Sequence, residues 1–383
     1  MQLDLSADQV LIRDAVRDLC AREFGPQASS WDREAVVPRQ AVARLAEQGF
    51  LGMAIPEDWG GVGYDSRTLL IVLEEIARVS AALAIMIAVH NSVGALPVFR
   101  FGTDEQRRRF LPRLVSRELA AFSLSEPGAG SDAGAIEATA TRTEQHYVLR
   151  GSKNWVTNGE QAGVYLIFAR TDKAVGSGGL TAFILERGTP GLVVGKAEDK
   201  MGLRGSDTVA LSLEDVKVPL DQRLGAEGEG FKIAMSMLDA GRIGVAAQAL
   251  GVMGAAFEES VRYAQQRRAF GQPIARQQAV QFKLAEMERR IQASRLLIWR
   301  AAWLKDTGQP YTREASMAKL YASEAATWVT HQAVQVHGGY GYVKEFAVER
   351  YYRDARVMEI YEGTSEIQRL VIARSLLKDG VKV

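Results

Sequence analysis

The spacing of apolar residues changes twice along the chain and divides it into three zones. In the first zone apolar positions recur at helical spacing, as at Leu11, Ala15 and Leu19, and prolines separate one such segment from the next. Ser6 and Gln9 have the form of a capping box directly before the first segment. We therefore expect an N-terminal domain that consists of several short helices.

The second zone consists of short runs of β-branched and aromatic residues separated by Gly, Pro, Asn and Asp. The runs are 164–169, 180–185, 192–194 and 209–213. In the last run apolar residues alternate with small or polar ones, which is typical of a half-buried strand. No long helical pattern lies between the runs, so an antiparallel sheet or barrel is favoured over a parallel α/β sheet.

The third zone returns to helical spacing over longer stretches, in 231–261, 280–298 and 318–336. A shorter helix is expected at the end of the chain, and the four together predict a bundle. The predicted fold class is thus α+β and multidomain. Its parts are an N-terminal helical domain (1–120), a central antiparallel β-barrel domain (121–227) and a C-terminal four-helix-bundle domain (228–383).

Charge and composition exclude several kinds of partner. Lys and Arg total 47 against 46 Asp and Glu, and this net charge of +1 argues against nucleic acid as the main partner. The single cysteine, Cys20, excludes an internal disulfide and a cysteine-based metal cluster, and four histidines leave little for a zinc site. We therefore expect no bound metal and a reducing, cytoplasmic location.

The run Val79–Phe99 carries no charged residue, so its length and polarity are compared with those of a membrane-spanning helix. His90, Asn91 and Pro97 interrupt it, and its purely apolar part is shorter than the roughly 20 residues that a span needs. A buried helix followed by a turn is the better interpretation, so no membrane insertion is expected.

Common catalytic motifs do not occur in the sequence. It contains neither the Gly-x-Ser-x-Gly of α/β-hydrolases nor a Walker loop. The segment Gly128–Gly134 is one residue off the dinucleotide fingerprint and is not followed by a helical pattern, which argues against a Rossmann domain.

Four polar, glycine-rich segments carry the candidate chemistry instead. They are Phe122–Asp132 (FSLSEPGAGSD), Lys153–Gly159 (KNWVTNG), Gln335–Tyr342 (QVHGGYGY) and Ile360–Arg369 (IYEGTSEIQR). In this order, and over nearly the whole chain, the segments resemble the acyl-CoA dehydrogenases. The resemblance implies that family's three-domain fold, FAD as the cofactor and dehydrogenation of an acyl-CoA thioester.

The resemblance also implies which residues bind FAD. Judged by residue type alone, Trp155 is equally well explained as barrel core and Arg267 as a solvated helix end. In the family, the indole lies against the flavin ring, and the arginine meets the diphosphate of FAD bound by a neighbouring subunit. A homotetramer, arranged as a dimer of dimers, is implied. The implied cofactor-binding residues are Phe122, Leu124, Ser125, Ser131, Trp155, Thr157, Arg267, Phe270, Gln278, Gln335, Gly338, Gly339, Thr364 and Glu366.

Glu362 is the catalytic residue that the resemblance implies. Dehydrogenation of a thioester needs a carboxylate base, desolvated enough to take a proton from the α-carbon. Isovaleryl and long-chain members of the family place the base at the position of Gly241 and carry glycine at that of Glu362, so this chain has the other arrangement. The implied substrate-binding residues are Ser131, Asp239, Arg242, Tyr361 and Gly363; from spacing alone, Asp239 and Arg242 are a helix-surface pair.

The predicted function is α,β-dehydrogenation of a short straight or branched acyl-CoA, with electrons passed to an electron-transferring flavoprotein. Fatty acid β-oxidation and branched-chain amino acid degradation are the processes that such a substrate indicates. The alternatives are an acyl-CoA oxidase, a sibling like the nitroalkane oxidases, and a non-catalytic assembly protein on the same fold. Nitroalkane oxidases use aspartate as base, so Glu362 weighs against them. The segment Met86–Ser92 holds no arginine, which disfavours a dicarboxylic substrate.

Overall fold

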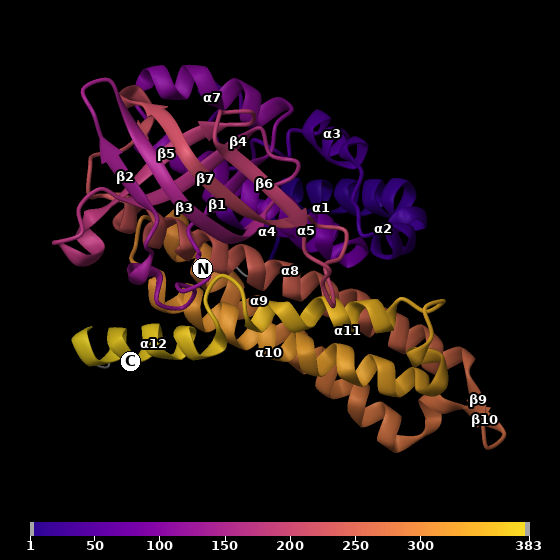
Figure 1. Ribbon diagram of the computed structural model, residues 1–383. Coiled ribbons are helices and arrows are strands. Elements are labelled where there is room, and N and C mark those ends of the chain that lie inside the picture. Colours follow the sequence, from indigo (N-terminus) through magenta and orange to yellow (C-terminus); the bar gives the residue numbers. More distant parts are fainter. Residues whose placement is uncertain (1–3, 380–383) are drawn as a thin grey trace.

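The chain runs from a group of short helices, through a β-sheet, into a bundle of long helices, in the computed structural model that describes residues 4–379 (Figure 1). This order agrees with the three zones of the sequence. The helices of the first part are α1 (Ala7–Leu19), α2 (Ala28–Glu34), α3 (Arg39–Glu47), α4 (Ser66–Val79), α5 (Ala81–Val89), α6 (Leu96–Phe101) and α7 (Asp104–Ser116). Two π-helical segments, η1 (Cys20–Phe24) and η4 (His90–Ala95), extend α1 and α5.

Side-chain caps fix where these first helices begin. The Ser6 hydroxyl accepts a hydrogen bond from Gln9 N at 3.2 Å, and the Gln9 side chain accepts one from Ser6 N at 3.2 Å. Thr103 and Gln106 form the same capping box at the start of α7. Each box satisfies backbone donors that the first turn of a helix leaves unpaired. The predicted start of α1 is confirmed.

The sheet has eight strands in the order β6-β7-β3-β2-β4-β5-β8, and β1 pairs with β4. The four predicted runs lie in β4, β5, β6 and β7. The strands are β1 (Ala120–Ser123), β2 (Thr139–Arg142), β3 (His146–Thr157), β4 (Val164–Arg170), β5 (Leu180–Glu186), β6 (Leu192–Ala197), β7 (Thr208–Pro219) and β8 (Arg223–Leu224).

The sheet differs from the prediction in two respects. Most neighbours are antiparallel, but β4 pairs in parallel with β1 and with β2. Parallel neighbours need a long connection, and β3 lies between β2 and β4 in the sequence and supplies one. Within the described residues the strand order is also an open path from β6 to β8 rather than a closed ring of pairs. The central domain is therefore a mixed sheet.

The C-terminal part confirms the long helices that the sequence predicts. They are α8 (Gly230–Gln266), α9 (Gln278–Asp306) and α10 (Thr312–His337), followed by α11 (Val348–Arg356) and α12 (Ser365–Asp379). A small hairpin of β9 (Arg268–Ala269) and β10 (Gln272–Pro273) connects α8 to α9. Figure 1 places this hairpin at the end of the bundle that points away from the sheet, whereas α12 lies toward the other end.

Apolar side chains join the three parts into a continuous interior. Successive residues of β4 face opposite sides, so Leu166 packs in one core with Phe110 of α7 and Ile233 of α8, while Ile167 packs in another with Phe183 of β5. The largest core is shared between helices of the first and last parts. Two apolar helical stretches, Ala81–Phe101 and Gly230–Gln266, are long enough to cross a membrane, and 89% of the tested window in each is buried within the protein.

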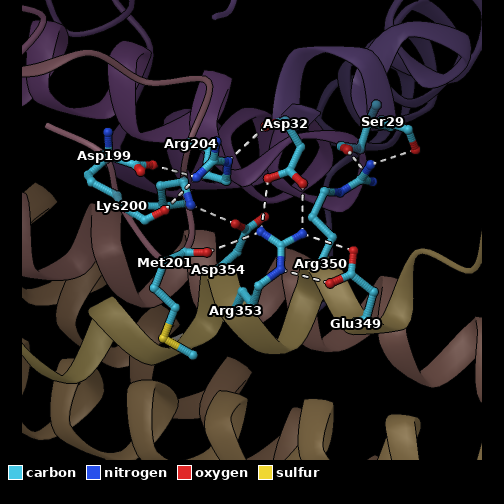
Figure 2. A network of polar contacts seen from close by, with 12 residues as sticks. Ser29, Asp32, Asp199, Lys200, Met201, Arg204, Glu349, Arg350, Arg353 and Asp354 are labelled. Atoms are coloured by element: carbon cyan, nitrogen blue, oxygen red, sulfur yellow. Dashed lines mark hydrogen bonds and ion pairs between the residues drawn. The ribbon is translucent and has the colours of Figure 1, made fainter. Parts of the chain in front are cut away.

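A partly buried polar network also connects all three parts (Figure 2). The Arg353 guanidinium of α11 donates to both carboxylate oxygens of Asp32 in α2, at 3.0 and 2.7 Å, and to Glu349. Asp354 accepts from Leu203 N, in the loop between β6 and β7, at 2.6 Å, and burial raises the pKa of Asp354 to about 6. These contacts fix the orientation of α11, which leads directly into the turn that carries Glu362.

Candidate active site

Glu362 lies in a tight turn between the 3₁₀ segment η10 (Val357–Glu359) and α12. Glu362 and Gly363 both have left-handed backbone conformations, with φ of 52° and 89°. The side chain reaches over α8 at Gly241, where an added Cβ would lie 2.7 Å from Glu362 Oε2. A glycine at position 241 is thus required for the carboxylate to lie where it does, because any side chain there would overlap with it.

The Glu362 carboxylate is enclosed although the residue as a whole is only partly buried. Its Oε2 is buried and has no hydrogen-bond partner among residues 4–379. Burial raises the pKa of Glu362 to about 7, and the positive charges of Arg242 and Lys319 oppose that rise. A carboxylate in this state is able to act as a base near neutral pH.

Arg242 and Asp239 form a buried pair rather than the surface pair that their spacing alone predicts. Arg242 Nη1 donates to Asp239 Oδ1 at 2.6 Å, and the two side chains are 7% and 14% exposed. Thr312 donates to the other Asp239 oxygen at 2.5 Å. The positive charge of Arg242 also acts on Glu362 and lowers its pKa, an effect that the sequence did not indicate.

Tyr361 is fixed against two helices. Its hydroxyl contacts Gln248 Oε1 on α8, and Gln248 Nε2 donates to Ala81 O on α5 at 2.7 Å. Gln248 is fully buried. The aromatic ring of the residue before Glu362 is therefore held in one position.

The two β-domain motifs lie together. Asn154 N donates to Ser125 O at 2.9 Å, which joins the segment after β1 to β3. Phe122 packs on Phe168 of β4 with ring centres 4.9 Å apart. Leu124 is buried, whereas Ser131 is exposed on the loop that follows.

A buried ion pair, which the sequence analysis missed, holds this loop. Lys153 Nζ donates to Glu126 Oε1 at 2.7 Å and to Leu124 O at 3.1 Å, and both charged side chains are at most 6% exposed. The other Glu126 oxygen accepts from the backbone N–H of Glu137 at 2.6 Å. Glu126 lies in the first of these motifs and Lys153 in the second, but nothing in their spacing along the sequence indicates that they form an ion pair.

The surface at these motifs fits a planar, phosphate-bearing cofactor such as FAD. Trp155 is 63% exposed, an unusual position for an indole, and its φ of 60° is left-handed and costs energy for a non-glycine residue. Thr157 is partly exposed at the end of the same strand. An added Cβ at Gly128 or Gly130 would meet no atom within 4 Å among the described residues, so a ligand is able to approach the backbone there closely.

Six of the implied cofactor-binding residues lie far from Glu362 within one chain. Arg267 follows the end of α8, and about 39 Å of helix separates it from Gly241. Its guanidinium lies 5.6 Å from the Tyr340 ring centre, and Phe270, close by, is 94% exposed. This distal group comprises Arg267, Phe270, Gln278, Gln335, Gly338 and Gly339. One chain does not bring it to Glu362.

Thr364 directly precedes α12 and Glu366 lies in its first turn, so both are close to Glu362 in the sequence. The Thr364 hydroxyl accepts from Ile367 N at 3.3 Å, the pattern of an N-terminal helix cap. Glu366 is exposed, and a hydrogen bond from its own backbone N–H lowers its pKa. Among the residues described, no group of three or more His, Cys, Asp or Glu side chains is placed to hold a metal ion.

Comparison with known proteins relates this geometry to one family. The N-terminal, middle and C-terminal domain models of acyl-CoA dehydrogenases match residues 6–118, 121–216 and 228–377. A bovine mitochondrial short-chain specific acyl-CoA dehydrogenase is 48% identical over 98% of this chain and 92% of its own length.

Two solved structures extend the likeness to three dimensions. Butyryl-CoA dehydrogenase from Megasphaera elsdenii has a TM-score of 0.97 at 43% identity, covering 98% of this chain and all of that one. A structure of PigA with FAD and proline has a TM-score of 0.96 at 29% identity, covering 99% of this chain and all of that one. The chain therefore belongs to the acyl-CoA dehydrogenase family, whose members are FAD-dependent oxidoreductases.

Proposed function

We propose that this protein oxidises a short-chain acyl-CoA thioester to the trans-2-enoyl-CoA and passes the electrons to an electron-transferring flavoprotein. The observation that carries the proposal is the Glu362 carboxylate, enclosed over Gly241 with a buried oxygen that has no hydrogen-bond partner among residues 4–379. A cytoplasmic location is part of the proposal, supported by the single, buried cysteine.

Several residues of the chain have separate roles in removing the proton. Glu362 accepts the α-proton of the thioester at Oε2, and the electron pair left behind forms the new double bond. The hydride acceptor for the β-carbon would be supplied by FAD, held at the surface of Trp155, Thr157 and the Gly128–Gly130 loop. Arg242 stabilises the carboxylate before the proton arrives, and Tyr361, held by Gln248, excludes water from one side of the base.

Removal of the base is the first test. We expect Glu362→Gln to keep the fold, the flavin and substrate binding but to lose turnover by about three or more orders of magnitude, since the amide does not accept the proton. The measurement is anaerobic mixing with substrate while the flavin absorbance is followed. Glu144→Gln, which neutralises an exposed glutamate, is the control and should behave like the wild type. Bleaching of the Glu362→Gln flavin at a near wild-type rate would mean that another residue is the base.

We further propose that the distal group of one chain completes the FAD site of a second copy within a homotetramer. About 39 Å of helix separates Arg267 from Gly241, which supports a contribution to another chain rather than to its own. The exposed rings of Phe270 and Tyr342, 94% and 88% exposed in the single chain, support a contact surface at this end.

Replacement of Arg267 tests the shared site. We expect Arg267→Ala to retain less FAD than the wild type after gel filtration. We also expect its oligomer to dissociate into smaller species at protein concentrations where the wild-type oligomer is intact, because the same guanidinium contacts both the cofactor and the neighbouring subunit. Arg268→Ala removes the same charge one residue away and is the matched control. Sedimentation and bound-flavin absorbance are the readouts. Equal flavin content and oligomer size in the two variants would contradict a shared site.

The proposed preference for short acyl chains rests on two bulky residues where α5 ends, Val89 and His90, where the family resemblance places the tail of a longer acyl group. His90 is buried and held in place, because Nε2 donates to Leu51 O at 2.9 Å while Nδ1 accepts from Ala120 N at 3.0 Å. Burial lowers the His90 pKa to about 4, so the ring is neutral and does not attract a distal carboxylate.

A panel of thioesters tests the chain length. We expect kcat/KM to be greatest at about four to six carbons and to fall over two or three further carbons, because a methylene that fits contributes about 0.8 kcal/mol and one that does not fit costs as much. The panel is butyryl-, isobutyryl-, hexanoyl-, octanoyl- and palmitoyl-CoA, with electron-transferring flavoprotein as acceptor and air as the comparison. An optimum at octanoyl-CoA or longer would contradict the short-chain assignment, and rapid turnover with air alone would favour an oxidase.

A further inference from the structure

A buried lysine and a buried glutamine converge on the turn that carries Glu362. Lys319 Nζ of α10 donates to Gly363 O at 2.8 Å. Gln368 Nε2 of α12 donates to Glu362 O at 3.0 Å and to Gly363 O at 2.8 Å. Both residues are 0% exposed. Three hydrogen bonds from two helices thus meet on two consecutive carbonyl groups.

The turn requires such support because its backbone is strained. Glu362 has a φ of 52°, a conformation that a non-glycine residue keeps only where the surroundings over-determine it. Gly363 is left-handed as well, and an added Cβ there would lie 2.7 Å from Gln368 Nε2. The donors therefore hold the backbone in the one conformation that directs the carboxylate onto Gly241.

The positive charge of Lys319 is less compensated by hydrogen-bonded anions than the positive charge of Arg242. Arg242 acts more strongly on Glu362 when each charge is taken alone, but Arg242 has Asp239 as a counter-ion at 2.6 Å. Lys319 has only a neutral carbonyl as its hydrogen-bond partner within residues 4–379.

The other charged groups around Lys319 are already engaged or exposed. Glu359 contacts Thr327 and lies near Arg356, and Glu366 is exposed to solvent. Glu362 is thus the remaining anion that the buried ammonium faces.

We propose that Lys319 and Gln368 are positioning residues for the catalytic base, and that the Lys319 ammonium, together with Arg242, keeps Glu362 ionised near neutral pH. Gln368 supplies position only, whereas Lys319 supplies position and charge. The proposal rests on the function proposed above, in which Glu362 is the base. In support, burial lowers the pKa of Lys319 to about 8, which leaves the group mostly protonated at pH 7.

Two variants of the holoenzyme separate charge from position. Lys319→Met removes one hydrogen bond and the charge; Gln368→Met removes two hydrogen bonds and no charge. The rate of flavin reduction by butyryl-CoA is measured from pH 5 to 9 under anaerobic conditions, with bound-flavin absorbance to verify that each variant is loaded. We expect both variants to lower the limiting rate about ten-fold with little change in KM, because the carboxylate is less well aimed.

The pH dependence should differ between the two variants. The wild-type rate rises with pH as Glu362 deprotonates, and Lys319→Met should move the midpoint upward by about one pH unit, because loss of a nearby cation disfavours the carboxylate. Gln368→Met should keep the wild-type midpoint. Lys319→Arg, which retains the positive charge, should also have the wild-type midpoint. If Lys319→Met does not fold, Lys319→Gln takes its place with the same expected shift.

Each contrary outcome identifies the part that is wrong. A wild-type midpoint in the neutral Lys319 variant overturns the role of the charge, and wild-type limiting rates in both methionine variants overturn the role in positioning. Glu362→Gln measured alongside separates this proposal from the proposed function. If Glu362→Gln still reduces its flavin, the base is misassigned; if it is inactive while Lys319→Met matches the wild type, only the present proposal fails.

Discussion

The proposed active site depends on one constraint: the Glu362 carboxylate must be removed from water and yet remain ionised. Removal from water raises the pKa of the carboxyl group and so makes the carboxylate a stronger base. The same rise leaves a larger fraction of the group protonated, and therefore inactive as a base, near neutral pH. Burial of Oε2 supplies the first requirement, and Arg242 and Lys319 supply the second. The glycine at position 241 and the left-handed turn at Glu362 follow from this constraint, since both serve to place the carboxylate where these charges reach it.

The three parts of the fold meet this constraint together. The network around Arg353 fixes α11 to the first helices and to the loop between β6 and β7, and α11 leads toward the turn that carries Glu362. Gln248 connects Tyr361 to α8 and α5. Since the largest core is shared between the first and last helices, the position of Glu362 depends on packing far from it.

Much of the fold could be predicted from the sequence because apolar spacing is strong where an element is long and regular. The runs in β4, β5 and β7 and the stripes of α8, α9 and α10 are of this kind. The residues of β3 show no regular apolar spacing of this kind. The strand carries Gly151 and several polar residues, and its register with β7 shifts twice, so the alternation that marks a strand is interrupted. The parallel pairs of β4 depend on tertiary contacts that no local pattern records.

The candidate site was predictable only as far as its motifs extend. Glu362, Trp155 and Arg267 lie in recognisable segments, whereas the roles of Lys319 and Gln368 depend on where α10 and α12 pack. In the sequence Lys319 resembles the other charged residues of α10, and its partner is a backbone carbonyl, which leaves no trace in residue type. The burial of the Asp239–Arg242 pair is a further property of the packed structure, because the same spacing also suits a helix surface.

The most direct test of this account is the titration of Glu362 itself. The carbonyl stretch of its protonated carboxyl group is measured by infrared difference spectroscopy of the holoenzyme against Glu362→Gln, as a function of pH. The account predicts that this band loses half its intensity near pH 7, the pKa to which burial raises the group. A band that has already disappeared at pH 5 would contradict a desolvated base and with it the arrangement described for the site.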